Sequence, residues 1–139
     1  MTLYADSSFL VSYLYPGDFN HGKARTFFRA HGNDDWLTSA WSQFETVNSL
    51  RSLCLNKPGP SPTTVEAIRR LFKHWHLAGP FELRWIEWEE VVREASQISA
   101  AFATRVKARA ADILHVAILE QLNPDLFVTF DRDQAALAT

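Results

Sequence analysis

Two apolar segments of the sequence each end directly on a carboxylate. Residues 2–5 precede Asp6 near the start of the chain, and residues 126–130 precede Asp131 near its end. If both segments are strands of one parallel sheet, the two acids lie at the carboxyl edge of that sheet, where open α/β folds bind their ligands. The pattern therefore predicts a ligand site at this edge, although an aspartate in such a position also caps the following helix in many proteins.

Glu45 lies inside a largely apolar stretch that predicts a helix over residues 39–55. At about 100° per residue it shares a face with Trp41 and has Phe44 beside it, so we expect its carboxylate to lie among core-facing neighbours. The alternative is a glutamate at the helix edge that extends into water, which is the commoner arrangement.

Asp112 is the remaining acid, at the start of a predicted helix over residues 110–122 whose later residues are almost all apolar. It shares a face with His115, which we expect to be a structural or supporting residue rather than a base. The alternative for Asp112 is a first-turn acid that interacts favourably with the helix dipole. Each acid has an ordinary structural explanation, but four that can point at one edge are harder to explain separately.

A cluster of carboxylates is retained mainly where a cation offsets its repulsion. Oxygen ligands without a cysteine cluster or a workable histidine pair suit a hard ion such as Mg²⁺ or Mn²⁺ rather than zinc. Asp133 competes with Asp131 for a place in such a site. The sequence predicts a metal site and catalytic centre formed by Asp6, Glu45, Asp112 and Asp131.

Strands and helices alternate along the chain, which predicts an α/β fold with a mainly parallel sheet covered on both faces. Ser7 or Ser8 is the expected cap of the first helix. Further helices are predicted from about residue 20 to 30, over 39–55, from 62 to about 79, over 89–106 and over 110–122. Strands are predicted at residues 2–5, 36–38, 81–86 and 126–130.

The size and composition suit one compact domain over residues 1–139. Hydrophobic residues make up 47% of the chain and charged residues 22%, which argues against disorder. The formal net charge is −2, so no overall basic field indicates nucleic-acid binding, and a polyanion would be held locally or through metal ions.

Cys54 is the single cysteine, which excludes an internal disulfide and fits a reducing compartment. Asp6 interrupts the first apolar run before it could span a bilayer, and the basic stretch of a signal peptide is lacking. We therefore expect a cytoplasmic protein with no membrane partner.

Four short motifs follow one another along the chain: Ala5 to Ser8, Glu45 in the first long helix after the second strand, Ala111 to Ala117, and Val128 to Asp133. In this order they resemble the PIN-domain nucleases, and the order and compact size most resemble the VapC-type ribonuclease toxins of toxin–antitoxin pairs. The resemblance covers nearly the whole chain. Each motif is short, and it is the combination of four in the right order that is specific.

The resemblance implies a three-layer α/β/α domain with a mainly parallel sheet of four or five strands, because the family often adds a short strand after its last acidic motif. It also implies that the four acids bind Mg²⁺ or Mn²⁺ and cleave RNA, with one or two ions. Such an ion makes a water more acidic and stabilises charge on the phosphate. The expected partners are an RNA substrate, a cognate antitoxin protein and a second copy of the chain in a homodimer.

A basic stretch before Asp112 could guide the RNA phosphate, or it could be an ordinary solvated turn. It contains Arg105, Lys107 and Arg109.

Other classes of protein also gather acids at the carboxyl edge of a parallel sheet. A phosphoacceptor signalling domain would have paired acids after its first strand and a lysine after its last, whereas Ser7 follows Asp6 here and no lysine follows Phe130. A haloacid-dehalogenase-type phosphatase would have a second aspartate where Ser8 stands. A non-catalytic interaction module would expose the apolar helical stripe formed by Val65, Ile68, Phe72 and Trp75, a pattern more typical of a core.

Overall fold

Four parallel strands form one sheet in the order β3-β2-β1-β4. The computed structural model describes residues 1–139, apart from the side chain of His76. In the register of the sheet, Tyr4 lies opposite Leu37 on one side and opposite Phe127 on the other. The end of β1 therefore lies between the ends of its two neighbours. The strands are β1 (Thr2–Ala5), β2 (Asp35–Ser39), β3 (Phe81–Arg84) and β4 (Leu126–Val128).

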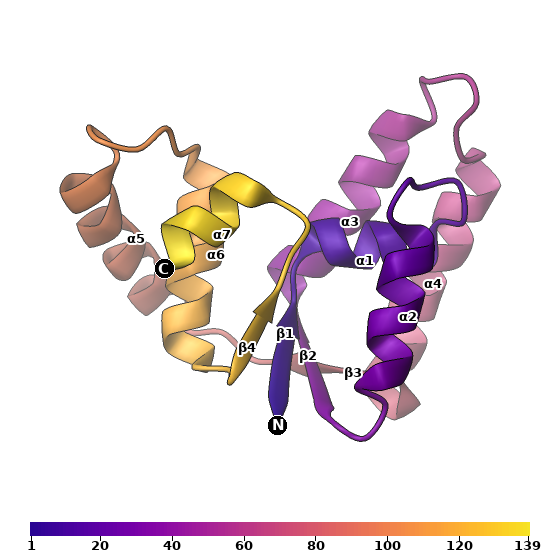
Figure 1. Ribbon diagram of the computed structural model, residues 1–139, viewed down its shortest axis with the longest axis horizontal. Coiled ribbons are helices and arrows are strands. Elements are labelled where there is room, and N and C mark those ends of the chain that lie inside the picture. The colour runs from indigo at the N-terminus through magenta and orange to yellow at the C-terminus, as the bar shows by residue number, and fades with distance from the viewer.

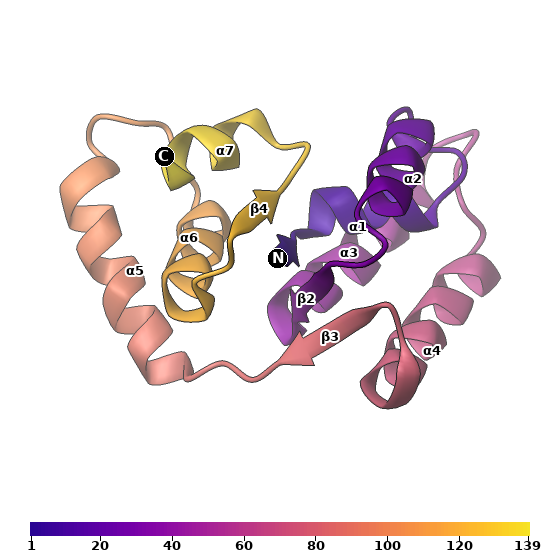
Figure 2. The same ribbon diagram turned by 60° about the horizontal axis from the view of Figure 1, so that its bottom comes forward.

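Helices cover both faces of this sheet, which confirms the three-layer α/β/α arrangement. One side carries α1 (Ser7–Leu14), α2 (His21–Ala30), α3 (Ala40–Leu53) and α4 (Pro62–Ala78) (Figures 1 and 2). The other side carries α5 (Trp88–Phe102), α6 (Ala110–Leu122) and α7 (Arg132–Ala138). In the part of the chain that the structure describes, none of these helices has the length and apolar character needed to cross a membrane.

The alternation of side chains along β1 explains why both faces need cover. Leu3 and Ala5 are fully buried in the core between the sheet and α1 to α4. Tyr4 points the other way and is fully buried in the second core, beneath α5 and α6. Successive residues of a strand face opposite sides, so an apolar run such as Leu3 to Ala5 is stable only between two layers of helices.

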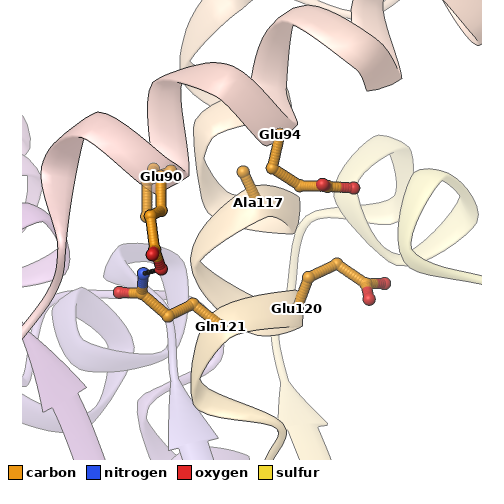
Figure 3. Close-up of a pocket in the computed structure, with 6 residues that line it drawn as sticks. Glu90, Glu94, Ala117, Glu120 and Gln121 are labelled. Carbon is orange, nitrogen blue, oxygen red and sulfur yellow. Dashed lines mark hydrogen bonds between the residues drawn. The ribbon is translucent and has the colours of Figure 1, made fainter.

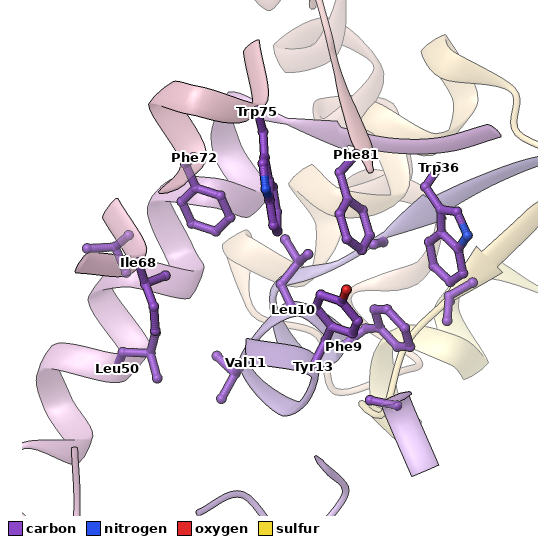
Figure 4. Packing of buried hydrophobic residues seen from close by; sticks show 14 of the residues in the cluster. Phe9, Leu10, Val11, Tyr13, Trp36, Leu50, Ile68, Phe72, Trp75 and Phe81 are labelled. Carbon is purple, nitrogen blue, oxygen red and sulfur yellow. The ribbon is translucent and has the colours of Figure 1, made fainter. Parts of the chain in front are cut away.

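Aromatic rings fill much of the first core (Figure 4). Phe9 stacks on Trp36 with ring centroids 5.1 Å apart, and Phe81 stacks on Trp75 at 4.9 Å. The α4 stripe packs into this core rather than facing solvent, so it does not support the interpretation as an exposed docking face. Its members Val65, Ile68, Phe72 and Trp75 are all buried.

The residues after Asp131 form α7, a helix that was not predicted from the sequence. Oδ1 of Asp131 accepts the backbone N–H of Asp133 at 2.9 Å and that of Gln134 at 3.2 Å, so the acid itself begins the helix. Gln134 is buried, which anchors the helix to the domain. Within the described residues the sheet therefore has four strands, the smaller of the two predicted numbers.

Several predicted boundaries lie further inward in the structure, among them the end of the helix predicted over 39–55, which is Leu53. The last strand ends at Val128 rather than residue 130, because the next backbone N–H groups bond to side chains. Helix α5 ends at Phe102 rather than residue 106, because two successive N–H groups of the following turn both bond to the carbonyl of Phe102. The strand predicted over 81–86 ends at Arg84.

Candidate active site at the carboxyl edge of the sheet

A cavity of about 440 Å³ opens at the carboxyl edge of the sheet, between α1, α3 and the first turns of α6 and α7. Three of the four predicted acids line it, and each comes from a different part of the chain: Glu45, Asp112 and Asp131. Asp6 does not line the cavity, but its neighbours Ser7 and Ser8 do. The fold thus brings three of the predicted residues to one cavity and places the fourth next to its wall.

Asp6 is the most buried of the four acids, with 1% of its surface exposed. Its Oδ1 accepts the backbone N–H of Phe9 at 2.8 Å, so Asp6 itself caps α1 and the predicted serine cap is wrong. Its Oδ2 accepts the Thr129 hydroxyl at 2.6 Å, and the Ser8 hydroxyl contacts both oxygens. Burial raises the pKa of this carboxyl, while the hydrogen bonds from Thr129, Phe9 and Ser8 act in the opposite direction.

Ser8 and Thr129 connect Asp6 to the end of β4. The Ser8 Oγ accepts the backbone N–H of Phe130 at 2.8 Å and lies 3.2 Å from the Thr129 hydroxyl. The Thr129 Oγ1 in turn accepts the backbone N–H of Asp131 at 2.9 Å. These bonds fix the position of Asp131 relative to Asp6, so the two strand-end acids belong to one hydrogen-bonded unit.

Glu45 is held by a histidine from another helix. Nε2 of His115 on α6 is hydrogen-bonded to Oε1 of Glu45 on α3. The His115 side chain is fully buried and that of Glu45 is 20% exposed. Nδ1 of His115 is buried and has no hydrogen-bond partner among the described residues. A neutral ring whose Nε2–H donates to Glu45 leaves no buried N–H unpaired, because Nδ1 then carries a lone pair rather than a hydrogen.

The packing around Glu45 differs from the prediction made from helical spacing. Its neighbour Phe44 is 57% exposed, so this part of α3 is not a core-facing ridge. Glu45 is partly buried because α6 packs beside it and supplies His115, a contact 70 residues away along the chain. The helical periodicity of α3 alone contains no information about that contact.

Asp112 has the first-turn position that the sequence indicated. Its Oδ2 accepts the backbone N–H of Arg109 at 3.0 Å and the Arg109 Nε at 3.4 Å, and its Oδ1 accepts the Gln134 amide at 3.4 Å. Burial raises the pKa of Asp112, but these hydrogen bonds and the Arg109 charge outweigh it and lower the pKa overall. Asp112 is therefore an ionised carboxylate at neutral pH.

Asp131 and Asp133 differ in where they lie. Asp131 is partly buried and lines the cavity, whereas Asp133 is exposed and lies outside it. Asp131 is therefore a better candidate than Asp133 for the fourth acid of the site.

The sequence matches the PIN domain over residues 3–139. The chain belongs to the PIN domain family. Among solved structures, it is similar to VapC20 of Mycobacterium tuberculosis, described as a toxin that cleaves the sarcin-ricin loop. The two share 17% identity with a TM-score of 0.74, over 96% of this chain and 93% of that one, which is a likeness of fold. A comparison with curated proteins finds no match.

Several polar residues at the cavity of this PIN domain were missed in the sequence, among them two on one loop. Asp18 and Asn20 line the cavity from the loop after α1, where Asp18 Oδ1 accepts the Asn20 backbone N–H at 2.8 Å. Helix α1 has eight residues and is therefore only about 12 Å long, so the loop that follows it stays near the edge where it began. The sequence signal for this short helix was the pair Pro16-Gly17, which follows its end.

The acids of this PIN domain are spaced rather than tightly clustered. Within the described residues, no three His, Cys, Asp or Glu side chains come close enough together to hold a metal ion directly between them. Arg109 is the one cationic side chain among the described residues that line the cavity. Four acids line the same cavity, Asp18, Glu45, Asp112 and Asp131, so the cavity is negatively charged overall.

A second acidic pocket lies between α5 and α6, away from this site (Figure 3). Glu90, Glu94 and Glu120 line it, together with Gln121, whose amide donates to Glu90 at 3.4 Å. None of the predicted site residues lines this pocket.

Proposed function

We propose that this PIN domain is a metal-dependent endoribonuclease whose metal-binding and catalytic residues are Asp6, Glu45, Asp112 and Asp131. The observation that carries the proposal is the single cavity lined by three of these acids, with Asp6 joined to its wall through Ser8. A divalent cation supplies an acidic water and stabilises charge on the phosphate, so hydrolysis of a phosphodiester at such a site requires no side-chain nucleophile.

The donor chemistry of the cavity fits Mg²⁺ or Mn²⁺. Every proposed ligand atom is a carboxylate oxygen, the donor that hard divalent cations prefer. Mg²⁺ usually keeps several waters and contacts only one or two carboxylates directly. Acids spaced too widely to surround a bare ion therefore suit a hydrated one, with the remaining carboxylates reached through water.

The surroundings of each acid prepare it for this role. Hydrogen bonds keep Asp112 ionised, and His115 fixes one oxygen of Glu45. Two backbone N–H groups hold Oδ1 of Asp131 in place. Burial disfavours the charged form of Asp6 and raises its pKa, and a nearby cation would favour that form and lower the pKa again.

The proposal extends to a toxin of a toxin–antitoxin pair that acts in the cytoplasm. The motif resemblance to VapC-type toxins supports it, as does the fold likeness to VapC20, which is described as a toxin that cleaves the sarcin-ricin loop. The partners are then an RNA substrate, a cognate antitoxin and a second copy of the chain. Co-purification with the product of the neighbouring gene tests the antitoxin, and light scattering on the eluted protein tests the homodimer.

The ribonuclease activity is tested by incubating the purified protein with a mixed cellular RNA pool and mapping the cut ends. Parallel reactions contain Mg²⁺, Mn²⁺ or chelator, and Asp112→Asn serves as the matched inactive variant. We expect ends that require a divalent cation and disappear in the variant. Equal cleavage by the folded variant would remove Asp112 from the site. A folded wild-type protein that cuts no RNA with either ion would favour the interaction-module alternative.

A further inference from the structure

A negatively charged cavity has to accept a negatively charged phosphodiester if the proposed ribonuclease function holds. Four acids face the cavity, and Arg109 is the one cation among its described lining residues. The loop before α6 carries three cationic side chains, and all three are exposed to solvent. Of these, Arg105 and Lys107 do not line the cavity. The structure therefore separates Arg109 from two neighbours that the sequence could not distinguish from it.

The side chain of Arg109 is only loosely held. Its Nε lies 3.4 Å from Oδ2 of Asp112, and 77% of the side chain is exposed. An ion pair with this exposure and distance contributes little to stability. The backbone N–H of Arg109 makes a separate bond to the same oxygen at 3.0 Å. The guanidinium group can therefore leave Asp112 while the backbone still anchors the loop to α6.

We propose that Arg109 binds the phosphate of the RNA substrate at the cavity, exchanging its side-chain contact with Asp112 for one with the phosphate. The guanidinium group presents a planar fork of N–H donors that matches two phosphate oxygens. A cation bound near Asp112 competes with Arg109 for the same carboxylate and favours the exchange. Arg109 is thus the substrate-binding residue of a site whose other charged side chains all repel RNA.

If Arg109 exchanges Asp112 for the RNA phosphate, replacing it should change the affinities for Mn²⁺ and for RNA in opposite directions. Arg109→Gln removes a positive charge beside Asp112, so the affinity for Mn²⁺ rises by about two- to fivefold. The same change weakens RNA binding by about five- to tenfold, because a charge-assisted phosphate contact is lost. It also reduces the slope of log affinity against log salt concentration by about 0.7, the value for one single-strand phosphate contact. A residue that only supports the fold would not change the two affinities in opposite directions.

The experiment measures both affinities on the full chain. Titration calorimetry gives Mn²⁺ binding without RNA. Fluorescence anisotropy with a labelled 20-nucleotide single-stranded RNA of random sequence gives RNA binding at several KCl concentrations, with Ca²⁺ as the divalent ion and the RNA checked for integrity on a gel. Arg109→Lys keeps the charge without the fork and should fall between wild type and Arg109→Gln. Arg105→Gln and Lys107→Gln each remove one charge from the same loop and should change RNA affinity by less than about twofold.

RNA affinity that stays at the wild-type value in Arg109→Gln overturns the inference, and so does an equal loss in either control variant. Circular dichroism confirms that each variant is folded. If the wild type cuts cellular RNA while Arg109→Gln binds RNA normally, the ribonuclease function stands and only the role of Arg109 fails. If the wild type neither binds nor cuts RNA, both proposals fail.

Discussion

A hydrogen bond from Nε2 of His115 to Oε1 of Glu45 joins α6 to α3 at the cavity. The ring is fully buried, so its position is set by packing rather than by solvent. A long, flexible glutamate on the surface of a helix would otherwise sample many rotamers. The bond limits Glu45 to orientations that keep its carboxylate at the cavity wall.

Replacing His115 by Leu should weaken Mn²⁺ binding by about 10-fold or more, as is typical when a residue that orients a metal ligand is lost. His115→Gln retains an N–H donor and should recover part of the affinity. The free energy of unfolding should change little with Leu, because the substitution also removes a buried nitrogen that lacks a partner. Calorimetric titration and thermal unfolding measure the two effects. His31→Gln, which breaks a histidine–aspartate pair outside the cavity, is the matched control and should bind Mn²⁺ normally.

Asp131→Asn should reduce cleavage by about 100-fold or more, since a cation contributes several kcal/mol to charge stabilisation in the transition state. The helix should survive, because asparagine also caps helices well. Asp133→Asn removes the same charge two residues away, outside the cavity, and should cut RNA within about twofold of wild type. Rates on one defined RNA, with circular dichroism of both variants, decide between them. Similar losses of cleavage rate in the two variants would show that the rate depends on the overall charge of the protein and not on the position of Asp131.

Asp6→Asn should raise the free energy of unfolding at neutral pH in the absence of metal. Burial raises the pKa of Asp6 in the folded protein, so the folded state binds this proton more tightly than the unfolded state does. The contribution of Asp6 to stability is therefore greatest below its unfolded pKa and falls as the pH rises toward the folded one. The advantage of the variant should accordingly shrink as the pH is lowered. Urea unfolding at several pH values measures the difference in free energy of unfolding between the variant and the wild type. If that difference grew toward acid pH, the pKa of Asp6 would be lowered by folding rather than raised.

Ser8→Ala should destabilise the protein by about 1–3 kcal/mol, because it leaves the backbone N–H of Phe130 without its partner and removes a donor to Asp6. Ser12→Ala is a suitable control on the same helix, since the Ser12 hydroxyl bonds only to the carbonyl one turn earlier and its loss leaves no backbone donor unpaired. Denaturant unfolding compares the two. If both variants had the stability of the wild type, the hydrogen bonds that Ser8 makes with Asp6 and Phe130 would not contribute to the free energy of unfolding.

Removal of metal should lower the melting temperature of the wild type. An ion that binds only the folded protein stabilises it by about 2.7 kcal/mol at one hundred times its Kd. Binding should weaken as the pH falls, because protons compete for the carboxylate oxygens. Thermal unfolding with Mg²⁺ or Mn²⁺ at two pH values tests this, with Asp112→Asn as the control. A rise of equal size in both proteins would place the ion elsewhere.

The sequence by itself determined the layers and the two strand-end acids. Apolar strands without alternating polar positions are stable only between two helical layers, as Tyr4 and Ala5 illustrate by facing opposite cores. Since the strands are parallel, Asp6 and Asp131 could be assigned to the same edge from their positions alone. Both inferences depend on residues adjacent in the chain, which is the range over which periodicity carries information.

Only the tertiary structure decided what surrounds the other charged residues. Glu45 lies at the cavity because α6 supplies His115 from 70 positions away, and helical spacing does not encode that contact. Arg109 lines the cavity while Lys107 does not, and Asp18 reaches it because α1 is short. The place of a side chain at a site built from several elements depends on how those elements pack, and packing is a property of the whole chain rather than of any local pattern.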